Sequence, residues 1–280
     1  MKKLNLLQKS SRLYIGLSIA VASLGGVVIL GWFFDQRSIT QIHPSFAPMQ
    51  FNTALCFLVL GITAILAISK YARISGLLAI FPLLIGVLTL FEYASGVDLG
   101  LDNFFFNSNI TTETSHLGRM APNTALCFTL TSISLIITQY LKKNSFQIGG
   151  LIGTLVFALG ATAFTGYLAS FKSTYAWGNL TQMALHTSVG FLICGIALGI
   201  FAWIKFSKSN QASNFDRVLV AYVTGFALII TCIDIAIPLG VMAGALHVLV
   251  LLATYYILSE KALTYFIILT SFLVCIGWVV

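Results

Sequence analysis

The sequence predicts an all-α integral membrane protein of about nine transmembrane helices, and three observations lead to this fold class. Of the 280 residues, 58% are hydrophobic and only 8% are charged, with a mean hydropathy of +0.96, whereas a soluble domain carries roughly 25% charged residues. Apolar segments approach the length of about 20 residues that a helix needs to cross a bilayer. A nine-residue stretch also recurs three times. The predicted spans are 14–34, 52–71, 74–96, 122–141, 148–170, 185–206, 216–237, 239–258 and 262–280.

Lysine and arginine fall mainly on one side of this array. If the N-terminus is cytoplasmic, 12 of the 15 basic residues lie in inner segments, as the positive-inside rule requires. Only Arg37, Arg119 and Lys172 lie outside. The net charge of +7 is therefore a topology signal, with membrane lipid as the expected partner and no role for nucleic acid. The predicted location is a bacterial inner membrane, with several spans and a cytoplasmic N-terminus.

The first span, Tyr14–Phe34, follows a basic N-terminus and has no small-residue cleavage site, so we interpret it as a retained helix. The second, fourth and sixth spans each open on a copy of the repeated stretch. The copies are "MQFNTALCF" (Met49–Phe57), "MAPNTALCF" (Met120–Phe128) and "MALHTSVGF" (Met183–Phe191). The first, third and fifth spans each end in an aromatic cluster, in "GWFFD", "FEYASG" and "TGYLAS".

The repeating unit is thus a helical hairpin with its loop outside, present three times in one orientation. Parallel repeats are related by an axis along the membrane normal. We predict a six-helix bundle with approximate threefold symmetry over residues 1–209, with repeats at about 12–72, 73–144 and 145–209. Residues 210–280 form a second, three-helix transmembrane module, which we expect to be incomplete.

The repeated junctions have a local explanation and a functional one. The first turn of a helix has unpaired N–H groups, which an Asn or Thr oxygen can cap, and Pro122 suits an early helical position. In a symmetric bundle, three positive helix ends could also converge on one outer binding mouth for an anion or a polar headgroup. The candidate ligand-binding residues are Asn52, Glu92, Arg119, Asn123 and His186.

Other polar residues allow alternatives. Asp98 and Asp102 could bind a cation or remain solvated loop acids. Thioether and imidazole ligands suit Cu(I), whereas buried methionine is also an ordinary packing residue; the copper candidates are Met49, Met120, Met183, His116 and His186. A haem could be held by His186 and His247. The main prediction includes no cofactor. The five cysteines lie in apolar runs, which favours free buried thiols.

Three motifs resemble the membrane-embedded sensory region of bacterial sensor histidine kinases and diguanylate cyclases. They are "GRMAPNTALCF" (118–128), "FEYASGVDLGLD" (91–102) and "MALHT" (183–187). The stretch "IDIAIPLGVMAGALHVL" (233–249) is similar to a second membrane module of such receptors, except that His247 stands where that module has tyrosine. The resemblance implies a membrane sensor that precedes a cytoplasmic kinase or cyclase domain.

The function we expect is therefore a sensory input domain that detects a small ligand or a membrane property at the outer face. It would relay the signal to a downstream output domain, and a second copy of the chain is a further candidate partner. No nucleotide-binding glycine loop, zincin motif or Ser/His/Asp order is present, so the chain itself is not predicted to be an enzyme. A small-solute transporter or channel is the main alternative, and a haem or copper protein is the second.

Overall fold

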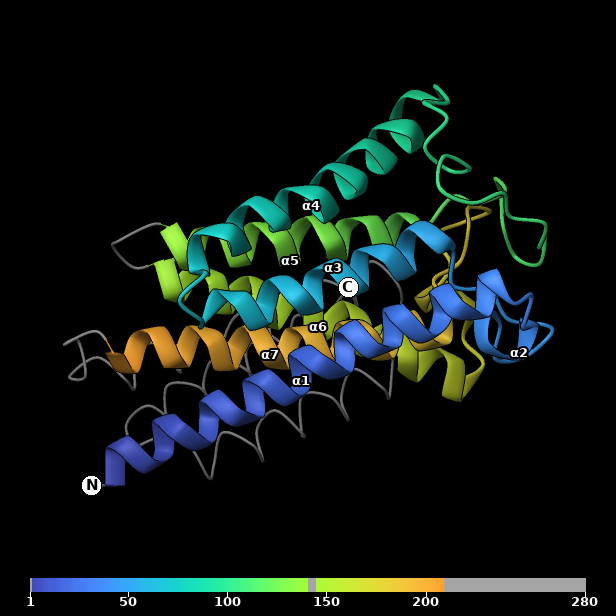
Figure 1. The fold of residues 1–280 in the computed structure, drawn as a ribbon. Helices are drawn as coiled ribbons and strands as arrows, with labels where there is room; N and C mark the ends of the chain where they lie inside the picture. Colours follow the sequence, from blue (N-terminus) through green and yellow to red (C-terminus); the bar gives the residue numbers. More distant parts are fainter. Residues whose placement is uncertain (1, 141–144, 209–280) are drawn as a thin grey trace, which may run out of the picture.

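The computed structural model describes residues 2–140 and 145–208, and all regular structure within these ranges is helical. Six long helices lie side by side (Figure 1). They are α1 (Lys2–Phe33), α3 (Phe51–Ala67), α4 (Ala72–Ser95), α5 (Pro122–Tyr140), α6 (Ser145–Ala169) and α7 (Leu185–Lys208). The short helix α2 (Arg37–Thr40) and a 3-10 turn (Lys172–Thr174) lie in the connections. The predicted spans 216–237, 239–258 and 262–280, and with them the module 210–280, lie outside the described residues.

Within residues 2–140 and 145–208, four helices are long and apolar enough to cross a membrane, which supports a membrane protein. These stretches are Asn5–Phe33, Ala72–Ser95, Ile148–Ala169 and Leu185–Ser207. The predicted span 52–71 forms a helix of only 17 residues, because the chain turns after Ala67. The predicted span 122–141 is a helix of 19 residues but is rich in Ser and Thr. Its hydroxyl groups at Thr129 and Thr131 donate to carbonyls one turn earlier, so they are satisfied within the helix.

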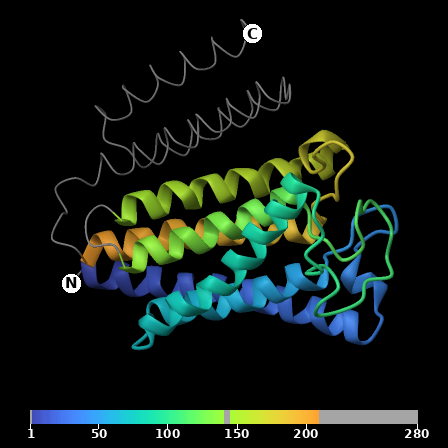
Figure 2. The same ribbon diagram turned by 90° about the horizontal axis from the view of Figure 1, so that it is seen from above.

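The helices pack as consecutive pairs that close into a ring. α1 packs on α3, α4 on α5 and α6 on α7, while contacts of α3 with α4, α5 with α6 and α7 with α1 join the pairs. The longer connections all lie at one end of the molecule, on the right in Figure 1 and again in the turned view of Figure 2. We call this the loop end; α1, α4 and α6 finish there, and α3, α5 and α7 begin there.

The same hydrogen bond fastens each pair at the loop end. An aromatic side chain near the end of the first helix donates to the backbone carbonyl of the methionine that precedes the second helix. The three bonds are Trp32 Nε1 to Met49 O (2.9 Å), Tyr93 Oη to Met120 O (3.0 Å) and Tyr167 Oη to Met183 O (2.6 Å). Because each carbonyl lies just outside a helix, the aromatic donor supplies a partner that the helix itself does not.

A glycine lies seven residues before each of these aromatic residues and brings the paired helices close together. A Cβ atom at this position would come within 3.0 Å of a backbone carbonyl on the second helix, five residues after the methionine. The pairs are Gly25 with Ala54 O, Gly86 with Ala125 O and Gly160 with Ser188 O. Small residues at such crossings let helix backbones approach and gain packing contacts that a lipid solvent alone would not drive.

Three phenylalanines join the second helices of the pairs at the centre. Phe57 of α3, Phe128 of α5 and Phe191 of α7 are each 0% exposed, and their ring centroids are 4.9 Å apart in all three pairings. The rings are tilted or edge-on to one another, the arrangement that the aromatic quadrupole favours. We call these residues the phenylalanine triad.

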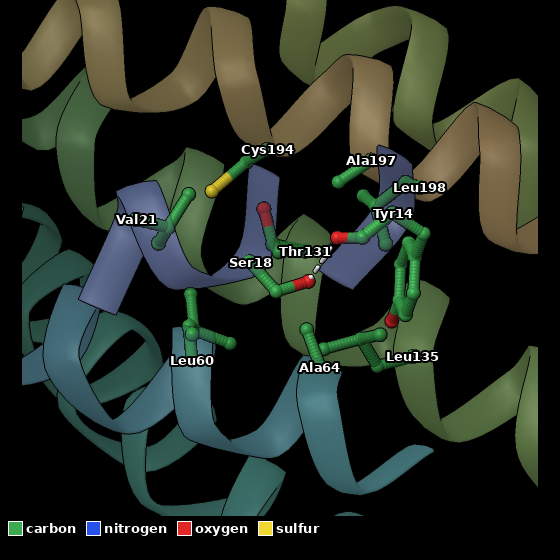
Figure 3. Close-up of a pocket in the computed structure, with 11 residues that line it drawn as sticks. Tyr14, Ser18, Val21, Leu60, Ala64, Thr131, Leu135, Cys194, Ala197 and Leu198 are labelled. Carbon is green, nitrogen blue, oxygen red and sulfur yellow. Dashed lines mark hydrogen bonds between the residues drawn. The ribbon is translucent and has the colours of Figure 1, made fainter. Parts of the chain in front are cut away.

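Beyond the triad, away from the loop end, the centre holds a small cavity of about 20 Å³ (Figure 3). Residues from α1, α3, α5 and α7 line it, including Leu60, Thr131 and Cys194, which each lie three residues after a triad phenylalanine. The Ser18 hydroxyl donates to Tyr14 O at 2.8 Å. A cavity of this size admits one water molecule. The phenylalanine triad and this small cavity lie next to each other between α3, α5 and α7.

The glycine contacts predict a stability difference between neighbouring positions. Gly25→Ala should lower the free energy of unfolding by about 1 to 3 kcal/mol, because the new methyl group overlaps the backbone of α3. Gly26→Ala is the matched control, since nothing lies within 4 Å of its Cβ position, and its effect should stay within about 1 kcal/mol. Thermal unfolding in detergent measures both. Equal melting temperatures for the two variants would contradict the close approach.

Candidate functional site

Arg119 lies at the loop end among three carboxylates. Its Nε is 2.7 Å from Asp102 Oδ2 and 3.5 Å from Glu92 Oε2, and its Nη2 is 3.6 Å from Asp98 Oδ1. Arg119 is 3% exposed and Glu92 0% exposed, and a charge buried to this degree is stable only when paired. The guanidinium group is thus the cation of the cluster, which we call the Arg119 cluster. The Tyr93 ring lies 5.5 Å from the guanidinium carbon and adds a cation–π contact.

The same cluster folds the connecting loop back over the end of α4. Glu92 Oε1 accepts a hydrogen bond from the Leu99 backbone N–H at 2.9 Å, and Asp98 Oδ1 accepts one from Gly100 N–H at 2.8 Å. Gly96 ends α4 in the left-handed conformation with φ +72°, and its N–H donates to Glu92 O. The sequence placed Glu92 and Arg119 in one cluster but treated Asp102 as a solvated acid or a cation ligand. The structure instead makes Asp102 the nearest partner of Arg119.

Asp102 has an unusual ionisation equilibrium. Burial raises the pKa of its carboxyl from 3.8 to about 6; the Arg119 guanidinium opposes this rise, while the nearby Glu92 and Asp98 carboxylates add to it. The main physical cause is the cost of removing a charged carboxylate from water, and repulsion from the neighbouring carboxylates adds to it. Asp102 therefore changes its charge near neutral pH.

Two of the predicted junction residues connect one helix pair to the next. Asn52 Nδ2, at the start of α3, donates to Gly118 O at 3.1 Å, and Asn123 Nδ2, at the start of α5, donates to Tyr175 O at 3.3 Å. Gly118 has φ +80°, and a Cβ there would collide with Asp102 O, so the close turn beside Arg119 requires glycine.

The capping role predicted for these residues holds only in part. Asn123 Oδ1 accepts from the Thr124 N–H at 2.9 Å, and Pro122 opens α5, as expected from the sequence. Asn52 lies inside the first turn of α3, and the residue before that helix, Gln50, makes no side-chain cap. The amide of Asn52 is used between helix pairs instead.

The third junction residue, His186, differs from the two asparagines. It is 7% exposed, and neither ring nitrogen has a hydrogen-bond partner in the part of the chain that the structure describes. Gly190, one turn further along α7, lies against Leu24 of α1 and Phe57 of α3, so this face of α7 is turned to the first helix pair. Gln50, also buried, has both amide atoms without a partner. Buried polar groups without partners are uncommon in native proteins.

The loops of the second and third helix pairs are tied together by contacts that the sequence did not indicate. Glu113 accepts two hydrogen bonds from Lys172 Nζ, at 2.8 and 2.9 Å, and a third from Gln182 Nε2. Ser115 and Thr181 exchange hydrogen bonds at 3.1 Å. The sequence does show that Glu113 and Lys172 carry opposite charges in different loops. The spacing of residues along the chain, however, does not predict which loops lie against each other.

The methionine and histidine copper candidates differ in burial. Met49, Met120 and Met183 are each 1% exposed, and their carbonyls accept the aromatic hydrogen bonds described above. His116 is exposed and lies beside Ser115. In residues 2–140 and 145–208, Glu92, Asp98 and Asp102 form the group of His, Cys, Asp or Glu side chains close enough to share a metal ion, and Arg119 lies against it. The haem candidate His247 lies outside the described residues.

The structure therefore brings Glu92 and Arg119 into contact and places Asn52 beside them through Gly118. Asn123 and His186 occupy the two other junctions. Comparison of the chain with known protein families, curated proteins and solved structures found no match. The contacts that join the helix pairs at the loop end include an ion pair and amide hydrogen bonds.

The raised pKa of Asp102 predicts a pH-dependent stability difference between the wild type and Asp102→Asn. The pKa of Asp102 is higher in the folded protein than in the unfolded chain, so the folded protein binds the proton more tightly. This group therefore favours folding below pH 3.8 and opposes it above about pH 6. The variant should gain stability relative to the wild type as pH rises between the two values, by up to about 1.4 kcal/mol per pH unit. Asp35→Asn, at an exposed position outside the Arg119 cluster, is the control. A constant difference across this pH range would contradict the assignment.

Exchanging residues between junctions tests the role of the asparagines. His186→Asn should raise the free energy of unfolding by about 1 kcal/mol, because an amide replaces an unpartnered buried imidazole. Asn123→His should lower it by about 1 to 2 kcal/mol, because the hydrogen bonds to Tyr175 O and Thr124 N–H are lost. Thermal unfolding of both variants gives the comparison. Destabilisation by His186→Asn would show that the imidazole has a structural partner.

Proposed function

We propose that this chain is a membrane-embedded sensory domain of a bacterial signalling receptor. In this proposal the three helix pairs form a threefold-related six-helix bundle within a nine-helix inner-membrane protein. The N-terminus is cytoplasmic, and the loop end is the outer face. A ligand or a membrane property at that face changes the packing between helix pairs, and the downstream helices carry the change to a kinase or cyclase output domain.

The observation that carries this proposal is the way the helix pairs are joined at the loop end. The start of α3 bonds to the loop of the second pair through Asn52 and Gly118, and the start of α5 bonds to the loop of the third through Asn123 and Tyr175. A displacement of one loop therefore acts directly on the second helix of the preceding pair. A signal requires two packings with different affinities for the stimulus, and amide contacts between rigid helix pairs can differ between such packings.

The junctions are also unequal, which suits a switch. Asn52 and Asn123 each bond to a neighbouring loop, whereas neither ring nitrogen of His186, on the α7 face that is turned to the first pair, has a hydrogen-bond partner among the described residues. A buried imidazole without a hydrogen-bond partner lowers the stability of the interface that contains it. We expect this third interface to move first.

The transporter alternative has less support. The phenylalanine triad is fully buried, the cavity beyond it has a volume of about 20 Å³, and α4 continues through Pro82 without a break. Transporter sites commonly use interrupted helices near the bilayer midplane.

The signalling proposal is tested with the product of the complete gene in isolated membranes. Asn52→Ala should change autophosphorylation from ATP, or cyclic dinucleotide synthesis from GTP, by about fivefold, because loss of about 1 kcal/mol shifts a two-state equilibrium by that factor. Asn107→Ala, an exposed loop asparagine with no side-chain hydrogen bond, is the matched control and should leave output unchanged.

Four results would count against the sensory function. The membranes could lack both activities, or Asn52→Ala could leave a measurable activity unchanged at equal protein abundance. Solute flux through liposomes that contain the purified protein would favour the transporter, and a Soret band would favour a haem protein.

A further inference from the structure

A hollow of about 410 Å³ lies at the loop end between the first two helix pairs. One wall comes from α2 and the residues after it, and the opposite wall from the loop that joins α4 to α5. The polar residues that line it are Arg37, Ser38, Gln41, Asn109, Thr111 and Thr112. The volume falls within the range of about 300 to 1,000 Å³ that is typical of small-molecule sites.

Arg37 gives the hollow its charge. The loop end has three basic residues in the described ranges, and two of them are neutralised: Arg119 by the carboxylates of its cluster and Lys172 by Glu113 at 2.8 Å. Arg37 takes part in no ion pair among the described residues, and no carboxylate lines the hollow. An unpaired guanidinium with nearby hydroxyl and amide groups is a site for an oxyanion.

Both walls are fixed before any ligand arrives. Gln41, which is 8% exposed, donates through Nε2 to Pro44 O at 3.1 Å and to Phe46 O at 2.7 Å, which holds the wall behind α2. On the other side Ile110 is 6% exposed and packs into the main core. A site with preformed walls spends less binding energy on ordering itself.

We propose that this hollow binds a small anion that carries a phosphate or carboxylate group. Arg37 is its counter-ion, and Ser38, Asn109, Thr111 and Thr112 supply hydrogen bonds. The inference rests on the proposed sensory function, for which it names the class of ligand. A bound anion links α2 to the loop that contains Gly118 and Arg119, so it acts on the Asn52 contact and the Arg119 cluster. The anion is either a free solute or the headgroup of an anionic lipid.

The test uses the purified chain in nanodiscs of phosphatidylcholine, with inorganic phosphate and succinate as probes in titration calorimetry. At least one probe should bind the wild type, and Arg37→Gln should weaken that binding about ten- to a hundredfold, as expected for a lost charge-assisted hydrogen bond. Ser38→Trp, which fills the hollow from an exposed position, should weaken it to a similar degree. Arg73→Gln, the same charge change in the first turn of α4 and so away from the loop end, should bind like the wild type.

A second arm separates the two sources of the anion. Nanodiscs that contain phosphatidylglycerol should raise the melting temperature of the wild type but not that of Arg37→Gln if a lipid headgroup is the occupant, and this supports the site with a lipid source. The proposal is overturned if neither probe nor lipid has an effect, or if both hollow variants respond like the wild type. If Asn52→Ala binds the anion like the wild type but has altered kinase or cyclase output, both proposals are supported. If its output is altered and no anion binds, the anion site alone is overturned.

Discussion

Mutual contact of three phenylalanine rings is the constraint on which the rest of the structure depends. Phe57, Phe128 and Phe191 come from three different helices, and each ring touches the other two at a centroid distance of 4.9 Å. Such a contact forms only if α3, α5 and α7 meet at the same depth and with the same face inward. Each of these helices is also held against the first helix of its pair, by the close contact at the glycine and by the aromatic hydrogen bond to the methionine carbonyl. Helix association in lipid depends on such packing and hydrogen bonds, because lipid supplies no hydrophobic drive between helices.

The polar chemistry of the loop end follows from this arrangement. Because α3, α5 and α7 begin at the same end of the molecule, their first residues lie beside the loops of neighbouring pairs. The Asn52 and Asn123 amides donate to backbone carbonyls of those loops. The Arg119 cluster then fixes the loop after α4, because carboxylates from α4 and from this loop surround the buried guanidinium group. The hollow beside Arg37 lies between α2 and this same loop. Proximity therefore couples a candidate ligand site, a buried ion cluster and an interhelical amide contact.

The repeated motif is not identical in its three copies. Two junctions have asparagine where the third has His186, and Gln50 replaces the alanine found at the equivalent place in the other two copies. Both departures bury polar groups that have no hydrogen-bond partner among the described residues, and burial of such groups costs free energy. Sites where a local rule is broken are frequently functional.

Composition, hydropathy and the threefold recurrence of one motif determined the helical membrane class, the positions of the described long helices and the equivalence of Met49, Met120 and Met183. These properties follow from local periodicity and solvent preference, which a single chain displays residue by residue. Only the tertiary structure decided that Asp102 is the nearest partner of Arg119, that Glu113 joins Lys172, and that Arg37 lacks a carboxylate among the described residues. Loop contacts depend on how rigid helices place distant segments, and nothing in the spacing of polar residues along a flexible connection specifies that placement.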